Sequence, residues 1–315
     1  MAETNEVEAL TRAFSGFGVD EKSFVAILGK WHPEQRQSFR KGTQFFVQDE
    51  RSFERWADEH VKKLSREFLR FKSAVVLWTM HPWERDARLM RDAVIDGSKS
   101  YNVVVEIACT RTSEELLGAR RAYHSIFDRS IEEDVAYNAD GVERKLLVAL
   151  VSAYRYEGTK VHEDVAKLEA KTLCGAIKNG AKKNPMEDDD VVRILSTRSK
   201  PHLVSVFKHY KDISGKTLDE DLVADSSLKD TAQCISTPHT YFIKVLDDAM
   251  NPTADENTKE GLTRVIVTRA DHDMKVITEE YHKQKGVTLT ERIEHMANGN
   301  FKDFLLTLLA RGGFN

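Results

Sequence analysis

The chain has 315 residues, of which 41% are hydrophobic, and 47 Lys and Arg against 51 Asp and Glu give it a formal net charge of −4. Its length allows a large core without disulfides, and its composition excludes collagen-like and disordered chains. A slightly acidic chain offers no overall positive field to nucleic acid or anionic lipid, so an anionic partner needs a local patch or a bridging cation.

Helical spacing of apolar residues runs through the whole chain, and alternating strand patterns are nearly absent. In chain order, the clearest predicted helices pass through Phe24–Leu28, Leu116–Phe127, Leu146–Leu147, Val191–Leu195 and Phe304–Leu305. Prolines and glycines fall mostly between the periodic segments, where they can start or end helices. The pattern predicts an all-α protein.

The chain carries features of an intracellular protein. Its start, Met1–Thr11, is acidic and lacks a secretory signal, and its best apolar stretch, Ala74–Met80, is too short to span a bilayer. Cys109, Cys174 and Cys234 are an odd number without close spacing, which favours a reducing compartment and disfavours a zinc site. We predict a cytoplasmic protein whose membrane contacts are peripheral.

An internal repeat organises the sequence. Three Thr-Arg dipeptides are followed by the same pattern of residues, with an apolar residue five positions after the arginine and a tyrosine twelve positions after it. The arginine and tyrosine pairs are Arg111 and Tyr123, Arg198 and Tyr210, and Arg269 and Tyr281. Such a shared register predicts that each unit packs in the same way.

A fourth, divergent copy leads the chain. Phe24–Leu28 resembles Val191–Leu195, Trp31 stands where the arginine would be, and the later half is eight or nine residues longer. The longest candidate linker, Tyr156–Glu163, divides the chain into two halves of two repeats each. The predicted boundaries are a short tail at 1–7 and repeats I to IV at 8–80, 81–155, 163–236 and 238–313.

Four such repeats resemble the annexin family, most closely the plant annexins. The resemblance rests on Trp83–Ala87, Cys109–Ser113 and Leu146–Gly158, and it covers about residues 8 to 313. It implies five helices per repeat in a right-handed superhelix, forming a curved disc whose convex face carries calcium loops. It also implies binding to acidic phospholipid membranes.

The family's calcium loop is similar to Gly16–Asp20, which reads G-x-G-V-D. On the family pattern the carbonyl oxygens of Phe14, Gly16 and Gly18 bind Ca²⁺, together with a carboxylate from a later helix and with water or a lipid phosphate. Calcium takes six to eight oxygens, and glycines let successive carbonyls converge. Asp20 is interpreted as the N-cap of the next helix.

The carboxylate is chosen by spacing. The usual family distance selects Asp58, whereas correction for the longer repeat I falls on Arg66 or Glu67, of which only Glu67 is an acid. We predict Glu67 as the ligand and keep Asp58 and Glu59 as alternates. Phe17 at the loop tip either inserts among lipid headgroups or packs against a neighbouring helix.

The other three loops depart from the motif. Repeat II has Asp96–Ser100 with Asn138 in place of the acid, and repeat III has the basic loop Asn179–Lys183. Repeat IV has Asn251–Asn257, rich in oxygen, with Met296 in place of the acid. We therefore expect lower affinity for calcium and membrane than in a relative with four sites.

Other functions stay open as alternatives. A helical scaffold could bind protein partners, with actin or another annexin as candidates; the actin motif of plant annexins is similar to Val192–Ile194. Channel activity would rest on the charged positions Asp86, Glu106, Arg111 and Arg264, and redox activity on Cys109 with Cys234.

No motif of an enzyme is evident, and we predict no catalysis and no nucleic-acid partner. The leading prediction is calcium-dependent binding to acidic phospholipid membranes, with recruitment from the cytoplasm when calcium rises.

Overall fold

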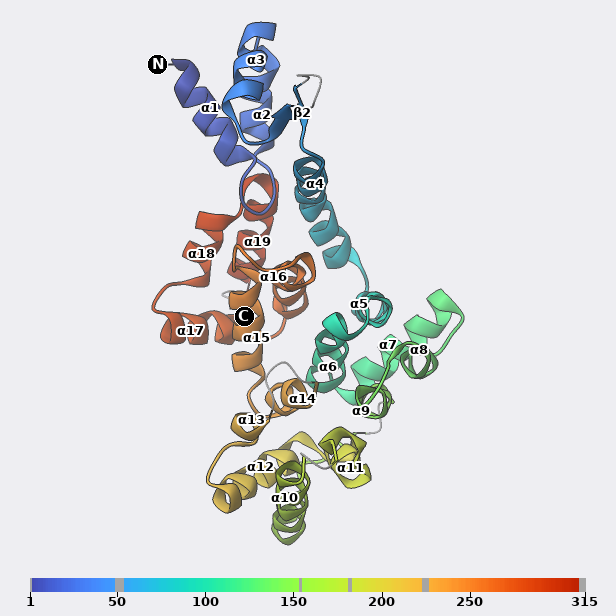
Figure 1. Cartoon of the computed structure of the whole chain (residues 1–315). Helices are drawn as coiled ribbons and strands as arrows, with labels where there is room; N and C mark the ends of the chain where they lie inside the picture. Colours follow the sequence, from blue (N-terminus) through green and yellow to red (C-terminus); the bar gives the residue numbers. More distant parts are fainter. Residues whose placement is uncertain (1, 49–53, 153–154, 181–182, 223–226, 312–315) are drawn as a thin grey trace. The chain divides into compact units, whose positions relative to one another are not determined.

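The computed structural model divides the chain into two compact units (Figure 1). The first joins Met1–Thr79 to Val245–Asn315 and so contains repeat I and most of repeat IV, while the second is Met80–Lys244. The predicted linker Tyr156–Glu163 lies inside the second unit, so the compact units differ from the two halves expected from that linker. The structure describes residues 2–48, 54–152, 155–180, 183–222 and 227–311.

Repeat I has four α-helices and a β-hairpin in its described residues. They are α1 (Ala2–Ala13), α2 (Glu21–Ile27), α3 (Pro33–Gly42), β1 (Phe46–Gln48), β2 (Glu54–Trp56) and α4 (Asp58–Thr79), with a 3₁₀ turn at Leu28–Lys30. Helix α1 begins at Ala2, so it takes in most of the stretch predicted as a tail.

Repeats II, III and IV each have five α-helices in their described residues, and the all-α prediction is confirmed. Repeat II has α5 (Pro82–Asp96), α6 (Tyr101–Thr110), α7 (Ser113–Phe127), α8 (Ile131–Asn138) and α9 (Glu143–Val151). Repeat III has α10 (Glu163–Lys178), α11 (Asp189–Thr197), α12 (Lys200–Ser214), α13 (Leu218–Asp221) and α14 (Ser227–Ser236). Repeat IV has α15 (Pro238–Ala249), α16 (Glu256–Arg269), α17 (Met274–Lys285), α18 (Leu289–Met296) and α19 (Gly299–Arg311). Further 3₁₀ turns lie at Ser98–Ser100 and Pro185–Glu187.

The hairpin stands where the other repeats have their fourth helix. Its two strands are antiparallel, with Phe46 opposite Trp56, and the ring centroids of these residues lie 4.4 Å apart. Aromatic residues favour strands, and this pair packs on the aromatic core of repeat I. Repeat I therefore differs from the expected five helices because its longer segment forms strands.

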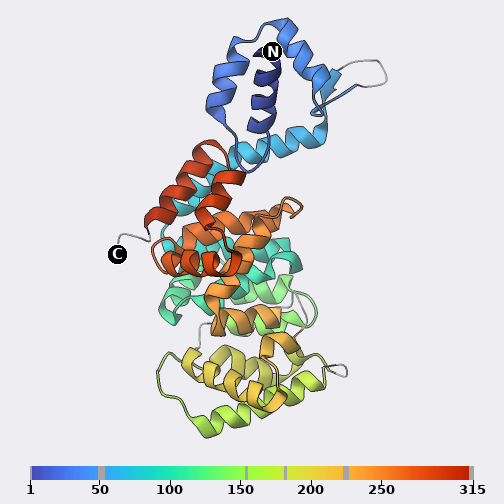
Figure 2. The same cartoon turned by 90° about the vertical axis from the view of Figure 1, so that its left-hand side faces the viewer.

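The core of repeat I differs in composition from the cores of the later repeats. In repeat I, α1, α2 and α3 pack side by side (Figure 2) around Leu10, Trp31, Phe39 and Phe45. In the later repeats the tyrosine of each repeat is fully buried. Burial of such large side chains supplies most of the driving force for packing.

The repeated arginines have a structural role. Arg111 donates to both oxygens of Asp86 at 2.7 and 2.9 Å, and Arg198 donates to Glu169 at 2.8 and 2.6 Å. Each pair ties the end of the repeat's second helix to its first helix. Arg269 of repeat IV pairs instead with Asp273, four residues after it, at 2.7 Å, so the contact to the first helix is shown for repeats II and III.

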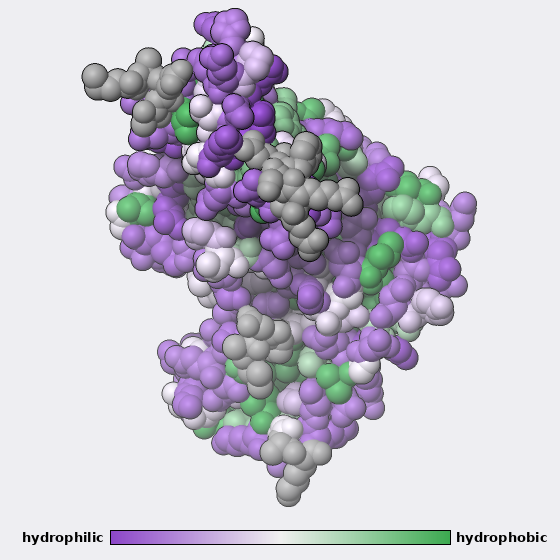
Figure 3. All heavy atoms as spheres, turned by 45° about the horizontal axis from the view of Figure 1, so that its top comes forward, coloured by the Kyte–Doolittle hydropathy of each residue, from purple (hydrophilic) through white to green (hydrophobic). Residues whose placement is uncertain are grey.

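No described helix combines the length and the hydropathy that crossing a membrane requires. On the face shown in Figure 3 most of the coloured residues are hydrophilic, and the apolar ones form small separate groups.

Candidate functional site

The repeat I loop joins α1 to α2 in the first unit. Gly16 has φ +89° and Gly18 has φ +75°, which glycine adopts at little cost because it lacks a Cβ. Asp20 caps α2, as predicted: its Oδ1 accepts from the Ser23 N–H at 3.2 Å and its Oδ2 from the Ser23 hydroxyl at 2.6 Å. These bonds lower the pKa of Asp20 despite partial burial.

The loop is held by the segment between α18 and α19 of repeat IV. The Phe17 N–H donates to Met296 O at 2.9 Å, and the Asn298 N–H donates to Phe17 O at 2.7 Å. The Asn298 side-chain amide also donates to Ser15 O. A Cβ on Gly16 would lie 2.6 Å from Met296 O, so only glycine permits this approach.

The loop carbonyls fall into two sets. Those of Ser15 and Phe17 accept hydrogen bonds from Asn298. Those of Phe14 and Gly16 accept none from the described residues, and Gly18 O has only a long contact of 3.5 Å to the Asn298 amide. The three carbonyls predicted as calcium ligands are therefore the ones that the loop leaves least engaged.

Glu67 of α4 lies against this loop. Its side chain is 4% exposed, and its Oε2 accepts from the Gly18 N–H at 2.8 Å. Asp58 starts the same continuous helix, about 13 Å away along the axis, and pairs with Arg55 at 3.1 Å. Glu59, beside it, is exposed. The structure thus brings Glu67 to the predicted loop, through the Gly18 N–H, and leaves both alternates elsewhere on α4.

Arg70 engages the same carboxylate. Its Nε donates to Glu67 Oε2 at 2.5 Å and its Nη2 to Glu67 Oε1 at 3.0 Å, and Nη2 also reaches Glu256 Oε2 at 2.8 Å. Burial lowers the pKa of Arg70, but its bonds to Glu67 and the two negative charges raise it overall. Sequence reasoning missed Arg70 and Glu256, although the spacing of Glu67 and Arg70 is that of a helical ion pair.

Phe17 is buried at 6% exposure, and the Arg70 guanidinium lies 4.8 Å from its ring centroid. Of the two predicted roles, the structure shows contact with neighbouring elements and not a tip that projects towards lipid.

Comparison with known proteins identifies the family. A family model described as Annexin matches residues 85–150, 173–227 and 241–308. Annexin D4 of Arabidopsis thaliana is 51% identical over 99% of both chains, and Annexin Gh1 of Gossypium hirsutum is 41% identical over 97% of this chain and 94% of its own. The chain belongs to the annexin family.

Solved annexins share its fold. Chicken annexin V matches with a TM-score of 0.68 at 26% identity, covering 98% of this chain and 95% of its own. A calcium-bound annexin (Sm)1 matches in fold with a TM-score of 0.64 at 19% identity, covering 98% and 90%. The predicted resemblance to plant annexins is confirmed, and membership supports calcium-dependent phospholipid binding in general.

The repeat II and repeat IV loops use some of their oxygens in hydrogen bonds within the loop. In repeat II, Gly97 O accepts from the Ser100 N–H at 2.9 Å, and the Asn138 amide, in place of the acid, donates to Asp134 O. In repeat IV, Asn251 Oδ1 accepts from Thr253, and Asp255 caps α16 by accepting from the Thr258 N–H at 2.8 Å. The repeat III loop includes residues 181–182, which lie outside the described residues.

No group of three or more His, Cys, Asp or Glu side chains suited to a metal is found in the described part of the chain. An annexin loop with one carboxylate and several carbonyls is compatible with that finding.

Most of the residues named for the redox and actin alternatives are buried. Cys109 and Cys234 are fully buried, and burial raises the pKa of both thiols, which keeps them protonated and poorly reactive. Val192 and Ile194 of the motif compared with the actin motif are buried in the second unit.

Proposed function

We propose that this annexin binds acidic phospholipid through Ca²⁺ held at the repeat I loop. The carbonyls of Phe14, Gly16 and Gly18 and the carboxylate of Glu67 would hold the ion, which when bound supplies a positive charge shared with a lipid phosphate. The observation that carries the proposal is the hydrogen bond of Glu67 to the Gly18 N–H, in a loop whose Phe14 and Gly16 carbonyls accept no hydrogen bond from the described residues.

Arg70 competes with calcium for the Glu67 carboxylate. Without calcium the Arg70 guanidinium neutralises the buried Glu67 carboxylate, which would otherwise be costly to keep charged. Glu67 can serve a cation fully only when its bonds to Arg70 are released. We therefore expect a calcium requirement higher than that of a loop whose carboxylate has no such partner.

Co-sedimentation with phosphatidylserine vesicles across a calcium titration tests the proposal. Wild type should pellet only with calcium, and Glu67→Gln should need at least about tenfold more calcium, because a bidentate charged ligand is lost. Glu59→Gln is the matched control on the same helix and should behave as wild type. Wild-type binding without calcium, or equal calcium dependence of the two variants, would contradict the proposal.

The proposal also treats the protein as a non-enzymatic cytoplasmic protein that moves to membranes when calcium rises. Its three cysteines are free and buried, which suits a reducing compartment. Cell fractionation in calcium and in chelator tests this, since a protein that stays in one fraction under both conditions does not fit it.

A further inference from the structure

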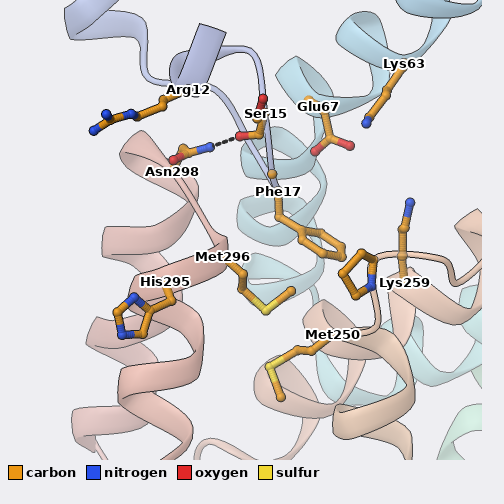
Figure 4. A pocket seen from close by; sticks show the side chains of 12 residues that line it. Arg12, Ser15, Phe17, Lys63, Glu67, Met250, Lys259, His295, Met296 and Asn298 are labelled. Atoms are coloured by element: carbon orange, nitrogen blue, oxygen red, sulfur yellow. Dashed lines mark hydrogen bonds between the residues drawn. The ribbon is translucent and has the colours of Figure 1, made fainter. Parts of the chain in front are cut away.

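A pocket of about 430 Å³ lies beside the repeat I loop, entirely within the first unit (Figure 4). This volume is in the range of small-ligand sites. Its walls come from α1, the repeat I loop at Ser15, Gly16 and Phe17, α4, the loop after α15, α16 and the segment at the end of α18. Its lining joins basic side chains to apolar ones.

The basic side chains outweigh the acidic one. Arg12, Lys63, Lys259 and His295 line the pocket beside one acid, Glu67, which pairs with Arg70 outside the lining. Arg12 pairs with Glu8 at 3.9 Å and Lys259 with Glu256 at 3.2 Å, so Lys63 is the lysine of this lining that has no ion pair among the described residues. The lining therefore carries more basic than acidic side chains although the whole chain is acidic.

Two lysines are placed to act together. Figure 4 shows Lys63 of α4 and Lys259 of α16 pointing toward one another. Lys63 forms no hydrogen bond or ion pair with the described residues, while Lys259 Nζ pairs with Glu256 at 3.2 Å. Lysine ammonium groups bind phosphate oxygens as compact charges with three donors each.

The rest of the lining suits an apolar group. Phe17, Met250, Pro252 and Met296 contribute apolar surface next to the lysines. Methionine side chains adapt to irregular apolar partners. A ligand that fits both parts carries a phosphate at one end and an apolar portion at the other.

We propose that this pocket binds a phosphate monoester without calcium, with the phosphate between Lys63 and Lys259 and any apolar part along the two methionines. A monoester carries more negative charge than a diester, so it gains more from two ammonium groups. The monoester could be a lipid headgroup or a soluble phosphate. The pocket shares Gly16 and Glu67 with the proposed calcium site, but its lysines belong to the chain itself, so phosphate binding between them does not require calcium.

Vesicle co-sedimentation in excess chelator tests the proposal, with phosphatidic acid in phosphatidylcholine compared with phosphatidylcholine alone. Titration calorimetry with inorganic phosphate is the soluble arm. Lys63→Gln should weaken binding about tenfold, the effect of losing one charge-assisted contact. Lys62→Gln is the matched control, since Lys62 is the adjacent exposed lysine of α4 and does not line the pocket.

The outcomes distinguish a lipid ligand from a soluble one. Binding to phosphatidic acid that Lys63→Gln weakens and Lys62→Gln does not supports a lipid monoester, and the same pattern for inorganic phosphate alone supports a soluble one. Absence of binding to both phosphatidic acid and inorganic phosphate, or equal weakening by the two variants, would contradict the proposal that this pocket binds phosphate. These results are separate from the calcium test, since every measurement is made in chelator.

Discussion

Replacing Arg70 with glutamine removes the charge that neutralises Glu67. Both side chains are largely buried, at 8% and 4% exposure, and Arg70 makes three hydrogen bonds to two carboxylates. Removing one partner of a buried ion pair typically costs about 3 to 5 kcal/mol. Glu67 keeps the bond from the Gly18 N–H, so we expect a loss near the lower limit, about 3 kcal/mol, in chelator.

This loss can be converted to a melting temperature. The first unit has about 150 residues, and at that size 1 kcal/mol shifts the unfolding midpoint by about 2 to 4 °C. Arg70→Gln should therefore melt about 6 to 12 °C below wild type in chelator. Calcium at about 100 times its dissociation constant should restore about 2.7 kcal/mol, the stabilisation by a ligand that binds only the folded state at that excess. The variant should reach this excess at a lower calcium concentration than wild type, because its carboxylate no longer has to leave Arg70.

Calorimetric melting curves with and without calcium check the prediction. Arg66→Gln is the control, since Arg66 is exposed on the same helix and makes no hydrogen bond or ion pair with the described residues. A variant Arg70→Gln that melts within about 2 °C of wild type in chelator and does not respond to calcium would refute the role assigned to Arg70.

Three further predictions follow from single contacts. Tyr123→Phe should lower the free energy of unfolding by about 1.5 to 3 kcal/mol, because its hydroxyl donates to a buried carboxylate. Tyr281→Phe should be neutral or stabilising, because that hydroxyl has no hydrogen bond in the described residues, and urea denaturation compares the two. Burial raises the pKa of Glu256, but two neighbouring cations hold it below its ordinary value of 4.5. The unfolded state then binds more protons than the folded state, so the stabilisation from Glu256 is fully present above pH 4.5 and is lost as the pH falls through the folded-state pKa. Glu256→Gln should therefore make the free energy of unfolding fall less steeply with decreasing pH. Gly16→Ala should destabilise the fold more than Gly97→Ala in thermal melts, because both have positive φ but only Gly16 faces a backbone oxygen at 2.6 Å.

The repeat could be predicted because one packing position recurs. Tyr123, Tyr210 and Tyr281 each follow a Thr-Arg dipeptide by twelve residues, and all three are fully buried. The positive φ of Gly16 and Gly18 could be predicted for a similar reason, since few other residues adopt it. Spacing also selected Glu67, which the structure places at the loop.

The partners of the site could not be predicted in the same way. Asn298 holds the loop from 280 residues away in the sequence, and Glu256 meets Arg70 from 186 residues away. Local patterns carry no signal for such contacts. The strands β1 and β2 could not be predicted from the sequence, because strands of three residues are too short to show an alternating pattern.

Calcium titration calorimetry in the presence of short-chain phosphatidylserine tests the central claim most directly. If the repeat I loop and Glu67 hold calcium, wild type shows a binding event that Glu67→Gln weakens at least about tenfold and Asp58→Asn leaves unchanged. Superimposable isotherms for wild type and Glu67→Gln would contradict the account.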